Sequence, residues 1–231
     1  MASAATDKVN SSELSGAPNR TNADLTLADN RCPYLLLICA FIAALGTLAL
    51  GVGNIVATLI VPNHNPISET ISDLAAGPYE SIQDVALYGF AAALFACSIG
   101  ASHFHSGQLR WTGGIFSLAM SAAVVTIIAA RNEYGDNDTD GVEIHIYLVY
   151  ALGLLFALIT SLMAAGMRHI VPWCGFISIA CFVVWVICAP LFFMLPTSID
   201  GAWERGLGII AVIWTLTFAY VTAVVRRRYL T

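Results

Sequence analysis

The chain has 231 residues, of which 58% are hydrophobic and 11% are charged, with a formal net charge of -5 and a mean hydropathy of +0.77. Soluble domains carry about 25% charged residues, so this composition excludes an ordinary soluble globular protein. We therefore expect an integral membrane protein.

Residues 1–33 form a polar segment rich in Ser, Ala, Asn and Asp, without an apolar repeat. A segment of this kind cannot bury enough apolar surface to fold, so we expect a disordered cytoplasmic tail. It is too polar to contain the core of a signal peptide, and the apolar stretch that follows is too long to be one. That stretch should therefore be retained as a helix.

Six apolar stretches follow, each near or above the roughly 20 residues that a helix needs to cross a hydrocarbon core of about 30 Å. None of them contains Asp, Glu, Lys or Arg, which argues against ion-coupled transporters, proton pumps and voltage sensors. The sequence predicts an all-α, six-transmembrane-helix bundle over residues 34–225 and a basic end at residues 226–231. The expected spans are Tyr34 to Val61, Val85 to Ser102, Thr112 to Ala130, Ile146 to Met167, Val171 to Leu195, and Leu207 to Val225.

The basic residues predict the orientation, because Lys and Arg near span ends are retained in the cytoplasm. With six spans, the two termini and the second and fourth loops share one side. That side holds eight of the ten basic residues, namely Lys8, Arg20, Arg31, Arg110, Arg168, Arg226, Arg227 and Arg228. We expect both termini to be cytoplasmic in an inner (plasma) membrane. The final arginines are interpreted as a lipid anchor and not as a nucleic-acid patch.

Polar residues are concentrated in the first loop, which should face the exterior. Ser68 and Ser72 are four residues apart, as are Glu69 and Asp73, so a helical conformation would place each pair on one face. These hydroxyls and carboxylates lie beside the membrane boundary. They are the first candidates for ligand binding.

Three further candidates belong to the other outer loops. His145 opens the fourth span, and Glu204 and Arg205 immediately precede the sixth. Together with the first loop they would form a polar rim around the outer mouth of the bundle, able to bind a cation or a polar head group. The alternative interpretation is a set of helix caps, solvated loops and ion pairs to Arg131 or Arg205.

The third loop contains the beginning of a calcium-binding pattern. Asp136, Asp138 and Asp140 alternate and are followed by Gly141, as in the first half of an EF-hand loop. The twelfth position is Tyr147 and not the bidentate Glu, which favours a solvated acidic turn. We expect no cofactor, with a divalent cation at these three aspartates as the alternative.

The first loop, from Pro66 to Pro78, resembles the signature loop of a bacterial and archaeal six-helix family called domain of unknown function 998. The acidic third loop leading to His145, and the Glu204-Arg205 pair, are also similar to that family. The Pro-Ile-Ser pattern is distantly similar to eukaryotic Frag, DRAM and Sfk-type membrane proteins, which are linked to lipid and autophagy roles. The resemblance implies a six-helix fold and assigns no activity.

Three functional hypotheses follow. The first is binding of a membrane lipid head group or small polar ligand, oriented by Glu69, Asp73 and His145 and hydrogen-bonded by Ser68 and Ser72. The second is a membrane hydrolase in which Asp73 and His145, with or without a metal, activate water. The third is an accessory subunit that binds another membrane protein through its lipid-facing surface.

Overall fold

The computed structural model describes residues 32–75, 79–105, 107–130 and 144–231. The chain divides into two units, Met1–Arg31 and Cys32–Thr231, and all contacts given below lie within the second. The predicted disordered tail up to Arg31 lies outside the described residues, as do Asp136, Asp138 and Asp140 of the third loop.

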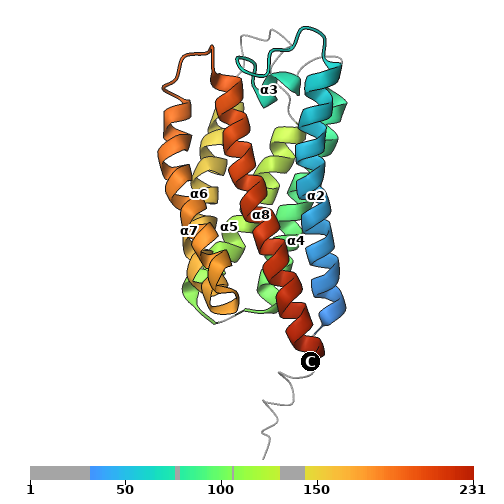
Figure 1. Cartoon of the computed structure of the whole chain (residues 1–231), viewed down its shortest axis with the longest axis vertical. Coiled ribbons are helices and arrows are strands. Elements are labelled where there is room, and N and C mark those ends of the chain that lie inside the picture. Colours follow the sequence, from blue (N-terminus) through green and yellow to red (C-terminus); the bar gives the residue numbers. More distant parts are fainter. Residues whose placement is uncertain (1–31, 76–78, 106, 131–143) are drawn as a thin grey trace, which may run out of the picture. The chain divides into compact units, whose positions relative to one another are not determined.

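The described residues of the second unit form six long helices and one short one (Figure 1). The six long helices are apolar enough to cross a membrane, and only 17% to 56% of the residues in their most apolar windows are buried. Many of their large apolar side chains are exposed, as is expected of helices surrounded by lipid. The elements are α2 (Pro33–Ile60), α3 (Ile71–Leu74), α4 (Glu80–His103), α5 (Leu109–Ala130), α6 (Ile144–Ile170), α7 (Pro172–Phe192) and α8 (Asp200–Leu230).

The predicted all-α, six-span bundle is confirmed, with differences at helix ends. The last helix begins at Asp200 and not near Leu207, because the polar residues before Leu207 continue the helix and contact the first loop. The fifth long helix ends at Phe192, two residues after Pro190, and not at Leu195. Its first residue is Pro172, whose fixed backbone angle suits a helix start.

The long helices form a closed ring in chain order. Each packs against the next, and α8 returns to pack against α2. We call the end that carries α3 the loop end, and the end where α2 begins and α8 finishes the terminal end (Figure 1). The two ends of the unit thus share one side of the bundle, as an even number of spans requires. The assignment of that side to the cytoplasm stays a prediction.

The half of the bundle toward the terminal end is filled by aromatic rings. Trp214 and Phe218 of α8 stack with ring centroids 5.4 Å apart, and Trp111 and Phe104 pack against Phe218 at 6.2 Å each. The Trp214 indole N–H donates to the Ser178 hydroxyl at 2.8 Å, so its polar atom is satisfied inside the core. Because aromatic side chains fill this half, the open space inside the ring of helices lies toward the loop end.

Candidate functional site

The short helix α3 is positioned by a capping box. Thr70 precedes the helix, and its hydroxyl accepts a hydrogen bond from the Asp73 backbone N–H at 3.1 Å. The Asp73 carboxylate in turn accepts from the Thr70 N–H at 2.6 Å. This reciprocal pair satisfies donors that a helix start leaves open. Asp73 therefore has a structural role in ordering the first loop.

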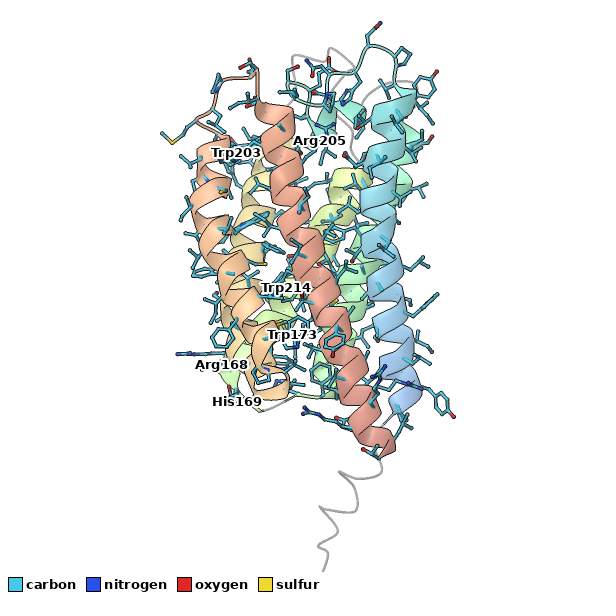
Figure 2. The ribbon with its side chains drawn as sticks, viewed as in Figure 1. Arg168, His169, Trp173, Trp203, Arg205 and Trp214 are labelled. Atoms are coloured by element: carbon cyan, nitrogen blue, oxygen red, sulfur yellow. The ribbon has the colours of Figure 1, made fainter. Side chains whose placement is uncertain are left out.

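Arg205 fixes the same loop to α8. Its Nη1 donates to the carbonyl oxygens of Pro66 at 2.9 Å, Glu69 at 2.7 Å and Gly201 at 3.0 Å. A Cβ at Gly201 would lie 2.0 Å from the Glu69 carbonyl oxygen, so this close approach requires glycine. The planar guanidinium suits such a cluster of carbonyls. Arg205 thus holds the loop through its backbone (Figure 2).

His64 continues this network to Glu69. Its Nε2 lies 2.9 Å from Arg205 Nη2, and its Nδ1 lies 2.7 Å from Glu69 Oε2. Arginine has no acceptor, so Nε2 must accept and Nδ1 must carry the proton that it donates to Glu69. The side chain of His64 is only 2% exposed. His64 thus connects Glu69 to Arg205.

A second set of polar groups comes together from three helices. The Ser72 hydroxyl of α3 lies 3.2 Å from Nε2 of His145 in α6 and donates to Glu204 Oε1 of α8 at 3.4 Å. The other oxygen of Glu204 accepts from the Ile71 N–H at 2.5 Å. With the Ser72 proton directed to Glu204, the donor in the Ser72–His145 contact is His145 Nε2–H. We call Ser72, His145 and Glu204 the polar cluster.

The polar cluster lines one end of a cavity of about 640 Å³ inside the ring. On α6 the lining runs from His145 to Ala157, twelve residues further along, or about 18 Å of helix. Every long helix contributes to the wall, and most of the lining is aliphatic or aromatic. Among the described lining residues there is no Lys or Arg, and Glu204 is the single carboxyl group.

The wall between α6 and α7 borders the lipid-facing surface. Four large hydrophobic residues that line the cavity are also exposed: Tyr150 (47%), Leu154 (64%), Val186 (46%) and Phe193 (41%). The rings of Tyr150 and Phe193 meet across this wall with centroids 4.5 Å apart. We call these four residues the α6–α7 rim.

The predicted site residues thus divide into two groups. Ser72, His145 and Glu204 meet at the cavity, whereas Glu69, Asp73 and Arg205 take part in contacts that order the first loop. Ser68 is half-buried in that loop. The predicted pairing of Ser68 with Ser72, and of Glu69 with Asp73, on one helical face is wrong because α3 begins only at Ile71.

The hydrolase and metal hypotheses stay predictions. The Asp73 carboxylate accepts from the Thr70 backbone, and the residue in contact with His145 is Ser72. Within the described ranges, no group of three or more His, Cys, Asp and Glu side chains is arranged to hold a metal ion. The predicted cation ligands Asp136, Asp138 and Asp140 lie outside those ranges.

Sequence reasoning missed His64 and the cavity. The sequence around His64 does not indicate that its partner is Arg205, which lies 141 positions away. Gly153 and Ala157 are small residues four apart, a spacing typical of close helix packing. Both instead line the cavity, and a Cβ at Gly153 would meet nothing within 4 Å.

Comparison with known proteins gives one match. The family model described as "Protein of unknown function (DUF998)" matches residues 37–221, which cover most of the six-helix unit. No curated protein and no solved structure matches the chain. The distant resemblance to Frag, DRAM and Sfk-type proteins therefore stays a prediction.

Proposed function

We propose that this multi-pass membrane protein binds a membrane lipid. The chain belongs to the DUF998 family of proteins of unknown function. The hydrocarbon part of the lipid occupies the cavity, and its head contacts Ser72, His145 and Glu204. By the distribution of basic residues, the head lies on the extracytoplasmic side of the plasma membrane.

The observation that supports this proposal is the distribution of polarity in the cavity. Binding sites for small amphiphilic molecules are concave, mostly apolar, and carry a few polar groups that fix orientation. Here the polar cluster lies at the loop end, and the wall toward Trp185, Ala157 and Ala211 is apolar. A molecule with a polar head and a hydrocarbon chain matches both parts at once.

The volume and the access route agree with the same ligand class. A cavity of about 640 Å³ falls within the roughly 300–1,000 Å³ typical of ligand pockets. The α6–α7 rim borders the surface that would contact lipid acyl chains. A lipid is thus the most abundant apolar molecule next to the cavity.

The test is native mass spectrometry of the gently solubilised full chain, with two matched glycine variants. Gly153→Leu places a side chain in the cavity, and Gly51→Leu places the same side chain on α2 at a position that does not line it. Neither added Cβ meets an atom within 4 Å, so both variants should fold.

We expect a lipid adduct on the wild type and on Gly51→Leu, and its loss from Gly153→Leu. Thermal unfolding checks that the variants remain folded. A wild-type protein without lipid, or the same adduct on a folded Gly153→Leu variant, would contradict the proposal.

A further inference from the structure

Resting on the proposed function, we infer that the cavity selects a single-chain lipid with an uncharged head that both donates and accepts hydrogen bonds, such as a monoacylglycerol or a long-chain alcohol. Charge, hydrogen-bonding capacity and size each point to this class.

The charge of the lining disfavours an anionic head. The described lining has no Lys or Arg, so a phosphate or carboxylate beside Ser72 would face the Glu204 carboxyl group without a described Lys or Arg to pair with. Arg205 is adjacent in sequence, but its guanidinium is used by the carbonyls of the first loop and by His64. A buried anion without a partner is unfavourable.

The hydrogen bonds of the polar cluster disfavour a cationic head. Both oxygens of Glu204 already accept, one from Ile71 N–H and one from the Ser72 hydroxyl. His145 Nε2–H is then a donor that needs an acceptor whenever a ligand displaces it from Ser72. An ammonium group has donors only and cannot accept from His145, whereas a hydroxyl can accept from His145 and donate to Ser72. A hydroxylated neutral head therefore satisfies each member of the cluster.

The size of the cavity suits one hydrocarbon chain. A volume of about 640 Å³ lies within the range of pockets that hold one small ligand. The depth of about 18 Å along α6 is close to the hydrocarbon thickness of one leaflet, which is about half of 30 Å. One chain of ordinary length fits these dimensions.

The experiment compares three probes that share one dibrominated 18-carbon chain: a monoacylglycerol, a lysophosphatidate and a primary alkylamine. The full chain is reconstituted in nanodiscs of unbrominated phosphatidylcholine, and quenching of tryptophan fluorescence is titrated. Trp185 lines the cavity and serves as the reporter. Quenching measured on the Trp185→Phe variant comes from the other tryptophans, and it is subtracted from that of the wild type.

The quenching assigned to Trp185 should saturate with the monoacylglycerol, at a concentration at least tenfold lower than with either charged probe. Gly153→Leu should abolish this saturable component, and Gly51→Leu should leave it unchanged. Because the wild type alone gives the head-group comparison, the result does not depend on a variant that fails to fold.

The outcomes separate this inference from the proposed function. Equal affinities, or preference for the phosphate or amine probe, would overturn the head-group assignment and leave lipid binding intact. Tighter binding of a brominated two-chain phosphatidylcholine would overturn the single-chain assignment. The absence of saturable quenching with every probe would contradict lipid binding itself.

Discussion

The two halves of the bundle are built from the same helices and differ in what fills the ring. Toward the terminal end, Trp111, Trp214 and Phe218 fill the centre with stacked rings. Toward the loop end, the same helices present small residues to the cavity, including Gly153, Ala157, Ala189, Gly208 and Ala211. The small side chains at these positions therefore contribute to the space that the cavity occupies.

We therefore expect the aromatic half to contribute most to stability and the half with the cavity to bind the ligand. The side chains around Trp214 are closely packed. Truncating one of these rings would leave a void that its neighbours cannot fill, and would lower the free energy of unfolding. At the loop end the apolar wall already borders empty space. There the polar contacts of Arg205 and the capping box hold the first loop in place. Substitutions should therefore have different consequences in the two halves.

The largest expected effect separates two tryptophans that each donate one hydrogen bond. Trp214→Ala should lower the free energy of unfolding by about 3–5 kcal/mol, because the ring is fully buried and its partner Ser178 loses a donor. Trp185→Ala should cost clearly less, because Trp185 borders the cavity and its lost partner is the Gly153 carbonyl. Reversible unfolding in mixed micelles measures the loss in free energy of unfolding for each variant. Equal losses would contradict the expected difference between the two halves.

The next effect concerns the contact between α8 and the first loop. Gly201→Ala places a Cβ against the Glu69 carbonyl oxygen and should displace the loop, at a cost of about 1–3 kcal/mol. Gly206→Ala is the matched control, because a Cβ there meets nothing within 4 Å. Amide hydrogen exchange should rise at residues 65–73 in the first variant only. An unchanged exchange rate in Gly201→Ala would refute the close approach.

A smaller effect is expected from the capping box. Asp73→Ala removes the acceptor for the Thr70 N–H and should lower stability by about 1 kcal/mol. Asp73→Asn keeps a side-chain oxygen and should lose less. If Asp73 instead contacts ligand directly, Asp73→Asn will reduce lipid binding without changing the unfolding midpoint, and a lipid-binding titration alongside thermal unfolding will reveal it.

The smallest effect has the opposite sign. Gly153→Ala adds one methyl group in open space and removes the conformational freedom of a helical glycine, which should raise stability by about 0.5–1 kcal/mol. Lipid affinity should fall slightly because the cavity loses volume. A drop in stability measured by thermal unfolding would mean that Gly153 packs closely, as its spacing from Ala157 first indicated.

The sequence predicted those parts of the fold that depend on local composition. Six apolar stretches without charge define six spans, and Ser72, His145 and Glu204 were recognisable because polar residues at span ends are few. The short α3 was harder, because a four-residue helix depends on the Thr70–Asp73 cap and on contacts to α8. The position of Glu204 and Arg205 inside a helix depends on the same contacts.

The cavity could not be predicted from a single sequence. Gly153 and Ala157 have the spacing of a packing motif, and only the positions of neighbouring helices decide whether such a pair touches a neighbour or empty space. The contact of His64 with Arg205 likewise joins residues that lie 141 positions apart. Contacts between residues far apart in the sequence are therefore needed to distinguish the proposed binding residues from those that order the first loop.

The most direct test of the account is photo-crosslinking with a monoacylglycerol that carries a diazirine near the end of its chain. If the chain occupies the cavity, peptide mapping should locate saturable labelling at inward positions such as Ala157, Trp185 and Ala211, and Gly153→Leu should remove it. Labelling confined to outward-facing residues such as Leu59 and Ile209, unchanged by Gly153→Leu, would contradict the claim that this half of the bundle holds a lipid.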